Sequence, residues 1–297
     1  MHKTEGGEQH SYHSCLFTAS NWRGFPTWNL YSQKDTWEPN NAYYNCSSIS
    51  KRHGNMNVVV GSLNIDLVVR IPKIPRPAET LLGGDFNTCS GGKGANQAVA
   101  ASRLGGQVTM IGCVGNDSFG RELKVNLSQE RVDTIYILVI PNVSTGVALI
   151  QVDGLAQNSI AVASGANYRL TGDYVENAMR AINNIGVKVM SLEIPLETIY
   201  MAAQIALNRV VKVILNPSTV QSSENDLLQM VDYLIPNEYE IATMTGIQIQ
   251  NLKDINRAAQ QLISREVKNL IVILSNKGSV LFVAKTNENV IIPARKV

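Results

Sequence analysis

Residues 187–215 read VKVMSLEIPLETIYMAAQIALNRVVKVIL and alternate between two kinds of local structure. Residues 187–195 begin with branched apolar side chains, which favour a buried strand. Residues 197–208 suit a helix, and residues 210–215 again favour a strand. A strand, a helix and a second strand in succession predict parallel pairing, because parallel strands need a crossover connection, which is usually a helix. The stretch therefore predicts an α/β fold, with helices on both faces of a mainly parallel sheet.

The alternation extends to both sides of this stretch. Residues 57–71 predict two consecutive strands separated by a polar break. The prolines and alternating side chains of residues 71–90 suit short edge strands rather than a central sheet. Residues 132–163 predict further strands, joined by a turn at Asp153. We assign residues 71–90 and 132–163 to a small β lid.

Polar side chains follow the predicted strands of the parallel sheet. Ligands of such sheets bind beyond the carboxyl ends of the strands, so these side chains are candidates for a binding site. They are Asn64, Asp66, Glu193, Asn216, Asn237 and Ser275.

Composition restricts both the domain plan and the chemistry. All 4 histidines and all 3 tryptophans precede Gly54, and residues 1–54 show no sustained periodicity. We therefore expect a poorly ordered extension at 1–54 and a single domain at 55–297. A domain without histidine excludes a Ser-His-Asp triad and an HExxH zinc site. Catalysis would then rest on carboxylates, lysine, backbone amides or a bound metal.

Charge and hydropathy argue against two classes of partner. The net charge is +2 and no basic cluster concentrates it, so we expect no nucleic-acid partner. We find no apolar run near 18 residues and no signal peptide at the start, so we expect no membrane partner. The 4 cysteines are scattered, as is usual for reduced thiols. These features predict a cytoplasmic protein, with the nucleus as a second compartment.

The glycine-rich stretch SGGKGAN at residues 90–96 precedes an alanine-rich helical segment. It is not a Walker A loop, because Lys93 is followed by Gly94 rather than by Ser or Thr. One interpretation is a tight turn that leads into the helix. The other is a binding loop, in which small residues let a ligand approach the backbone and the amides of the helix start face hydroxyls or an anion. Lys93 and Asn96 would add a charge and an amide to such a site.

A series of short motifs occurs in order from residue 57 onward: GSLNIDLVV, SGGKGANQAVAASRLGG, IGCVGNDSFG, STGVALI, SGAN, LEIP, LNPS and IPNEYE. Each motif alone is weak, but the set resembles the ribokinases, a branch of the PfkB-type carbohydrate kinase family that also holds adenosine kinases and fructokinases. The resemblance covers residues 57–297. It implies a ribokinase-like sheet with a β lid, and ATP-dependent phosphorylation of D-ribose to D-ribose 5-phosphate. It also implies Mg²⁺, activation by K⁺ and a homodimer formed through the lid strands.

The resemblance assigns one group of residues to the sugar. Asn64 and Asp66 would bind sugar hydroxyls, although the same residues could form a turn at a strand end. Glu193 would accept from another hydroxyl, although an isolated carboxylate there could equally help cap a helix. The glycine-rich stretch would complete the sugar's hydrogen bonds through Gly92, Lys93, Gly94 and Asn96.

A second group is assigned to the nucleotide and its metal. Asn216 would contact phosphate, and Asn237 with Glu240 matches an Asn-x-x-Glu motif associated with Mg²⁺ and phosphate. The same pair also fits a capping box, and the two roles are compatible. The nucleotide loop of the family falls at residues 273–278, with Ser275, Asn276 and Gly278 as candidate contacts. Here Ile273 and Ser275 replace a threonine and a glycine of the family pattern, which puts some ATP contacts in doubt.

In related kinases a Gly-Ala-Gly-Asp segment follows the position of Val297. Its aspartate is the general base on the sugar, its amides form the anion hole, and the K⁺ site lies nearby. We therefore expect the base and the K⁺ site to lie beyond Val297, and residues 1–297 alone to transfer phosphate poorly, since general-base assistance supplies ~10²–10⁴-fold. The alternatives are a kinase for another sugar or a nucleoside, a non-catalytic sugar-binding or regulatory product, and an incomplete gene model.

Overall fold

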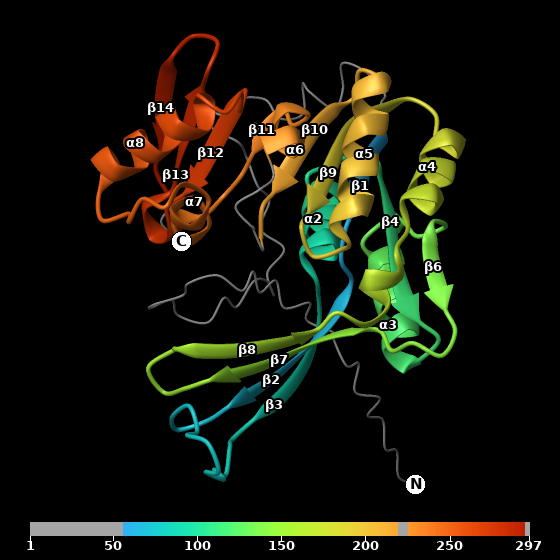
Figure 1. Cartoon of the computed structure of the whole chain (residues 1–297). Helices are drawn as coiled ribbons and strands as arrows, with labels where there is room; N and C mark the ends of the chain where they lie inside the picture. The colour runs from blue at the N-terminus through green and yellow to red at the C-terminus, as the bar shows by residue number, and fades with distance from the viewer. Residues whose placement is uncertain (1–55, 219–224, 295–297) are drawn as a thin grey trace, which may run out of the picture.

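A computed structural model describes residues 56–218 and 225–294. The predicted extension at 1–54 lies outside the described residues. The described chain forms a large sheet with helices packed on it and a separate four-stranded sheet at one end (Figure 1).

The central sheet has 10 strands in the order β14-β13-β12-β11-β10-β9-β1-β4-β5, with β6 also paired to β4. Its strands are β1 (Met56–Val60), β4 (Val108–Gly115), β5 (Val132–Asp133), β6 (Ile137–Ile140), β9 (Ile185–Ser191), β10 (Lys212–Asn216), β11 (Tyr233–Leu234), β12 (Asn269–Ile273), β13 (Ser279–Val283) and β14 (Glu288–Ile292). All pairings among β12, β11, β10, β9, β1, β4, β5 and β6 are parallel, and the pairings of β13 with β12 and with β14 are antiparallel. The predicted parallel sheet is confirmed.

Two hydrophobic cores cover the two faces of this sheet, and β1 shows how the sequence separates them. Val58 and Val60 face a core that includes side chains of α4 and α5, whereas Val59 faces a core that includes side chains of α2 and α3. Successive side chains of a strand point to opposite faces, so a fully apolar strand supplies both cores. The helices are α2 (Lys93–Arg103), α3 (Ser118–Gln129), α4 (Gly172–Ala181), α5 (Leu196–Asn208), α6 (Asn225–Gln229), α7 (Glu238–Thr245) and α8 (Leu252–Ile263), with short 3-10 turns η1 (Gly165–Arg169) and η2 (Ser275–Lys277).

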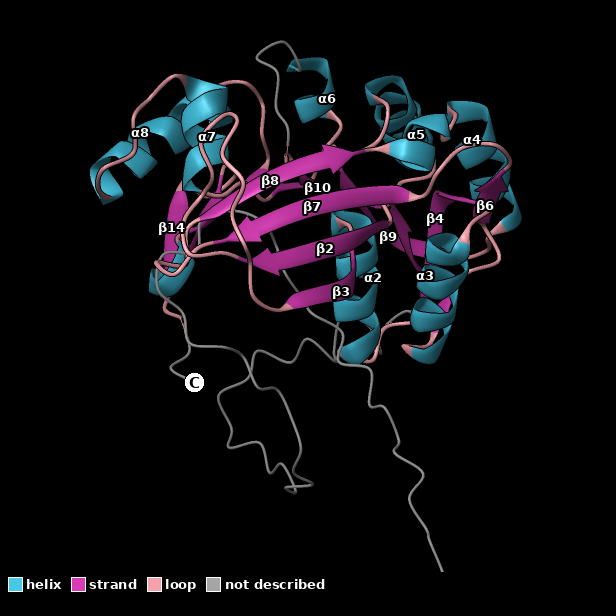
Figure 2. Ribbon diagram, turned by 90° about the horizontal axis from the view of Figure 1, so that it is seen from below, coloured by secondary structure: helices cyan, strands magenta, loops and turns pink. Residues whose placement is uncertain are grey.

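The second sheet is the lid, with the strand order β3-β2-β7-β8. Figure 2 shows these strands side by side, and Figure 1 shows them at one end of the central sheet. They are β2 (Asn64–Arg70), β3 (Phe86–Gly91), β7 (Gly146–Val152) and β8 (Asn158–Ala163).

The lid boundaries differ from our prediction in two places. Residues 71–85 contain no strand, and the lid instead takes β2, which we placed before it. Residues 132–140 form β5 and β6, which pair with β4 of the central sheet. Val132 and Ile137 are buried in the core of α2 and α3, and this burial holds the two short strands at the central sheet.

The bend between β1 and β2 carries the chain from the central sheet into the lid. Only residues 61–63 separate the two strands, and Gly61, Ser62 and Leu63 are all buried. Asn64 and Asp66 therefore lie inside a lid strand, not beyond the end of a central strand as we expected. They remain close to the central sheet, because β2 starts at the carboxyl end of β1.

Ser275 has a left-handed backbone conformation with φ 49, at the position where the family pattern has glycine. A side chain in this conformation costs roughly 1–2 kcal/mol, so we expect Ser275→Gly to raise the free energy of unfolding by about 1 kcal/mol. Urea denaturation measures this change. The matched control is Ser264→Gly at φ −65, where glycine has no such advantage and should lower stability. Equal effects of the two substitutions would contradict the left-handed assignment.

Candidate functional site

Glycines at the start of α2 let the helix pack directly against the β1–β2 bend. Gly92 has φ 90, and a Cβ there would lie 2.8 Å from the Ser62 carbonyl oxygen. A Cβ on Gly94 would lie 2.7 Å from the backbone nitrogen of Ser62. Contacts under 3.0 Å leave no room for a side chain, so both positions require glycine for packing. The mouth of the helix is thereby held close to the start of β2.

The first amides of α2 are occupied by groups of the chain itself. Lys93 N donates to Oε2 of Glu193 at 3.2 Å, and Ala95 N donates to the Ser62 carbonyl at 3.0 Å. Gly94 N lies 3.5 Å from Ser62 Oγ, which in turn donates to Glu193 Oε2 at 2.5 Å. These contacts argue against our expectation that the amides of residues 93–95 face a bound hydroxyl or anion, which stays a prediction. The anion at this helix start is the carboxylate of Glu193, where the helix dipole favours it.

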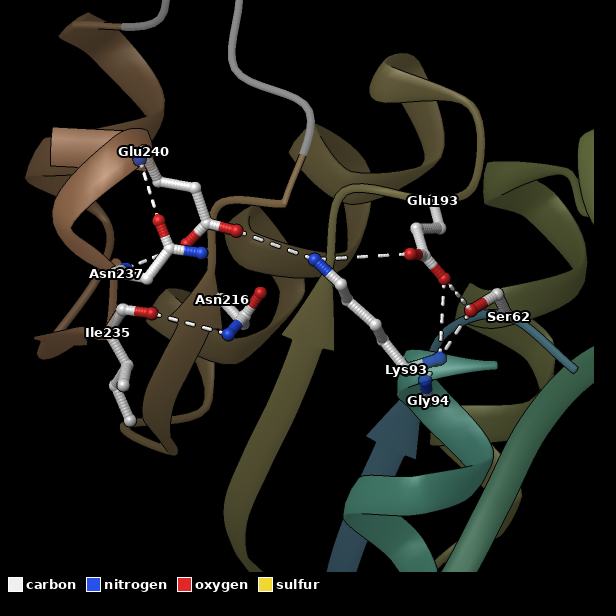
Figure 3. A network of polar contacts seen from close by, with 8 residues as sticks. All are labelled: Ser62, Lys93, Gly94, Glu193, Asn216, Ile235, Asn237 and Glu240. Atoms are coloured by element: carbon white, nitrogen blue, oxygen red, sulfur yellow. Dashed lines mark hydrogen bonds and ion pairs between the residues drawn. The ribbon is translucent and has the colours of Figure 1, made fainter. Parts of the chain in front are cut away.

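The side chain of Lys93 connects two groups of residues that the sequence assigned to different ligands. Its Nζ lies 3.4 Å from Oε1 of Glu240 and 4.0 Å from Oε1 of Glu193 (Figure 3). Only 16% of the Lys93 side chain is exposed, and 8% of that of Glu240. An ammonium in so little solvent interacts more strongly with both carboxylates than a surface ion pair would. The candidate sugar side and the candidate phosphate side thus share one lysine.

Glu240 is held in place by a capping box at the start of α7. Its backbone nitrogen donates to Asn237 Oδ1 at 2.8 Å, and its Oε2 accepts from Asn237 N at 2.9 Å (Figure 3). The capping alternative for this pair is therefore confirmed. Because Oε2 faces the helix start and Oε1 faces Lys93, the carboxylate has a fixed orientation at the carboxyl edge of β11.

Asn216 ends β10 and has a buried acceptor that no described residue satisfies. Its Nδ2 donates to the Ile235 carbonyl at 3.2 Å, whereas its Oδ1 has no hydrogen-bond partner among the described residues. Buried polar atoms are normally paired, so an unpaired oxygen at a sheet edge suggests a ligand or water. No group of three or more His, Cys, Asp or Glu side chains in residues 56–218 and 225–294 could hold a metal. Mg²⁺ commonly uses one or two carboxylates with phosphates and waters, so Glu240 and its neighbours fit that kind of binding and not a closed cage.

Asp66 is buried in the lid sheet opposite Cys89 of β3, with 5% exposure. A Cβ on Gly91 would collide with its carboxylate, so glycine at that position leaves space for the carboxylate. Burial raises the pKa of Asp66 from its ordinary value of 3.8 to about 7, and the negative charge of Glu193 adds to the rise. The two carboxylates therefore lie near one another, beside the mouth of α2.

Sequence reasoning missed two residues that hold this arrangement together. Ser62 bonds Glu193, and Asn167 of η1 hydrogen-bonds both Leu63 and Asn64. Both residues stand in quoted motifs, GSLNID and SGAN, but a serine or asparagine in a loop is usually read as a turn residue. Of the predicted sugar-side residues, Asn96 lies on the first turn of α2 and is half-buried.

The predicted nucleotide loop follows β12. Ser275 and Asn276 are exposed in η2, and Gly278 has φ 99, where a Cβ would collide with the Ile292 carbonyl. A bridge between Asn237 and Ile273 places this loop next to the start of α7. The loop is thus at the same sheet edge as Asn237 and Glu240.

Comparison with known proteins identifies the family of this chain. A family model described as "pfkB family carbohydrate kinase" matches residues 55–297. This chain belongs to that family. The family assignment confirms the ATP-dependent carbohydrate kinase and the ribokinase-like fold that the motifs predicted.

Individual relatives agree with the family model. The chain is 39% identical to a ribokinase of Haemophilus influenzae over 79% of this chain and 76% of the relative. It is 34% identical to a deoxyribokinase of Salmonella typhi, over 80% of this chain and 78% of the relative. The solved structure of Arabidopsis thaliana ribokinase complexed with ribose and ATP has a TM-score of 0.71 and 30% identity, covering 80% of this chain and 77% of that one. In the described residues, no helix is long and apolar enough to cross a membrane.

The raised pKa of Asp66 predicts a specific dependence of stability on pH. Its native-state pKa lies above the unfolded value, so its contribution is complete below about pH 4 and is lost as the pH rises towards 7. Asp66→Asn cannot ionise. We expect its free energy of unfolding, relative to wild type, to increase between pH 4 and pH 8.

Urea denaturation at a series of pH values measures this difference. Asp85→Asn, at an exposed aspartate before β3, is the matched control. The difference in free energy of unfolding between Asp66→Asn and wild type should change from pH 4 to pH 8. A constant difference would show that Asp66 is not buried beside another carboxylate.

Proposed function

We propose that this chain phosphorylates D-ribose with ATP and gives D-ribose 5-phosphate and ADP. The observation that carries the proposal is the shared position of Lys93, between Glu193 on one side and Glu240 on the other. A kinase must bring an alcohol and a phosphate together, and catalysis of phosphoryl transfer is largely positioning and charge stabilisation. Relatives named ribokinase, at 33–39% identity, support ribose as the alcohol.

On the sugar side, the proposed contacts divide by hydrogen-bond type. Asp66 and Glu193 supply acceptors, and Lys93 supplies a donor. Asn64 and Asn96 supply amides, and Gly92 and Gly94 keep the helix start close enough for these side chains to converge. A site that hydrogen-bonds a hydroxyl rejects an analogue that lacks it, because the buried partner is left unpaired.

On the phosphate side, we propose that Asn216, Asn237 and Glu240 face the phosphates of ATP. Ser275, Asn276 and Gly278 would contact the nucleotide from the loop after β12. Glu240 would hold Mg²⁺ through water or directly, and Mg²⁺ would neutralise charge on the transferred phosphoryl group. The unpaired Oδ1 of Asn216 supports this assignment. Activation by K⁺ stays a prediction from the family resemblance.

Two further proposals concern assembly and location. We propose a homodimer through the lid, because β8 is an edge strand of the lid with five of its six residues exposed, including Val162 at 57%. Exposed strand edges are ready to pair with another chain. Light scattering over a concentration series tests the dimer, and a monomer at all concentrations would contradict it. We also propose a cytoplasmic location, with the nucleus as a second compartment.

The second candidate substrate is 2-deoxyribose, which the similarity to a deoxyribokinase favours. Isothermal titration of the wild-type chain with D-ribose, 2-deoxyribose, fructose and adenosine separates the candidates. Phosphorus NMR of a mixture with ATP and Mg²⁺ then detects the phosphorylated product. We expect the tightest binding for ribose, and a slow appearance of ribose 5-phosphate as the phosphorylated product. Tighter binding of another compound would replace the substrate, and ribose binding without product would favour the sugar-binding alternative.

Lys93→Met tests the bridging lysine within this proposal. It keeps the length of the side chain and removes its charge, so Glu193 and Glu240 lose their common partner. We expect ribose affinity to fall by about tenfold or more, since truncating a buried charged partner costs roughly 2–5 kcal/mol. Lys253→Met, at an exposed position of α8, should leave ribose affinity unchanged. Equal affinities of the two variants would remove Lys93 from the sugar site.

A further inference from the structure

Asn167 is a buried side chain that reaches from η1 to the β1–β2 bend. It is 1% exposed. Its Oδ1 accepts from Leu63 N at 2.9 Å, and its Nδ2 donates to the Leu63 carbonyl at 3.1 Å and to Asn64 Oδ1 at 2.7 Å. Both N–H donors of the Asn167 side chain are therefore paired, and neither is left for a ligand.

The orientation of both amides follows from the backbone. A backbone N–H can only donate and a carbonyl oxygen can only accept, so Leu63 fixes which end of the Asn167 amide is oxygen and which is nitrogen. The atom of Asn64 that receives the second hydrogen must then be its oxygen. No ambiguity in placing amide oxygen and nitrogen remains along this chain of hydrogen bonds.

The same contacts decide which atoms Asn64 offers to a ligand. Its Oδ1 is directed at Asn167, and no residue within 56–218 or 225–294 is hydrogen-bonded to its Nδ2. Gly146 of β7 lies opposite Asn64, and a Cβ there would collide with Asn64 Oδ1 and Asn167 Nδ2. A glycine at this position leaves the space in which the two amides meet.

We propose that Asn167 is a positioning residue that orients the Asn64 amide so that Asn64 can only donate to the bound sugar. This inference rests on the proposed sugar site. Asn64 and Asp66 lie on the same face of β2, two residues apart. Asn64 then presents hydrogens and Asp66 presents carboxylate oxygens. The sugar must accept at the first position and donate at the second, which makes the pair a determinant of substrate specificity.

Asn167→Asp tests this orientation with almost no change in shape. The introduced carboxylate can still accept from Leu63 N but cannot donate, so Asn64 is expected to rotate its Nδ2 towards the new oxygen and its Oδ1 towards the sugar. We expect ribose affinity, measured by isothermal titration of the full chain, to fall by about tenfold or more. Asn289→Asp, an exposed asparagine of β14, is the matched control and should bind ribose as the wild type does.

Sugar analogues give a readout that a purely structural role would not change. At the hydroxyl that contacts Asn64, a fluorine can accept weakly from Nδ2, whereas a hydrogen cannot accept. To find this hydroxyl, each deoxy analogue of ribose is titrated into Asn64→Ala. The analogue that this variant binds as tightly as it binds ribose marks the position that Asn64 contacts. At that position the wild type should bind the fluoro analogue more tightly than the deoxy analogue, and Asn167→Asp should bind the two equally. An unchanged preference in Asn167→Asp would overturn the proposal.

A double-substitution cycle separates action through Asn64 from damage to the bend. In the Asn64→Ala background, Asn167→Asp should change ribose affinity no further. An equal loss with and without Asn64 would show that Asn167 acts through the fold and would overturn the proposal. Urea denaturation reports the stability of each variant. If Asn167→Asp does not fold, Asn64→Asp provides the second test. The carboxylate of Asn64→Asp still accepts from Asn167 but offers only acceptors to the sugar. This variant should therefore also bind the fluoro and deoxy analogues equally.

Failure of this inference differs from failure of the proposed function. A wild-type chain that binds no ribose removes the sugar site, and the role of Asn167 with it. In the other outcome, the wild-type chain binds ribose, and Asn167→Asp binds ribose and both analogues as the wild type does. That result removes only the role of Asn167.

Discussion

The carboxylate of Glu193 at the mouth of α2 is the contact on which the rest of the site depends. It accepts from the Lys93 amide and from the Ser62 hydroxyl, and so it joins the end of β9, the start of α2 and the β1–β2 bend. A negative charge at a helix start is stabilised by the helix dipole and the unpaired amides. The interaction fixes where the chain leaves the central sheet and enters β2, and therefore where Asn64 and Asp66 lie.

Two electrostatic consequences follow from this placement. Burial raises the pKa of Asp66 to about 7 and the negative charge of Glu193 adds to the rise, so the two carboxylates together favour a ligand that donates hydrogen bonds. Glu193 also lies within 4.0 Å of the Lys93 ammonium, which Glu240 approaches from the phosphate side. Under the proposed function, this lysine would lie between the sugar and the transferred phosphoryl group.

The sequence was sufficient for the architecture, for physical reasons. Alternating apolar strands and helices specify a covered parallel sheet, and Asp117 and Thr171, which cap α3 and α4, are residue types that favour helix starts. The lid boundaries were not predictable in the same way. The strand with which a short strand pairs is set by burial in the tertiary structure, and not by the alternation of apolar and polar side chains along the short strand itself. Ser62 and Asn167 were missed because their partners lie more than 100 residues away in sequence.

The glycine-rich stretch shows the same limit at the level of function. Its small residues indicated a close approach to a helix start, and the structure gives that approach to the β1–β2 bend and to Glu193. The roles of these residues in sugar binding stay predictions.

A crystal structure of the chain with D-ribose would show the contacts of the sugar. We expect its hydroxyls to contact Asp66, Asn64 Nδ2, Lys93 Nζ and Glu193 Oε1, while the amides of Lys93 and Gly94 keep Glu193 and Ser62 as partners. A ribose bound instead to those helix amides, with Glu193 displaced, would contradict this expectation.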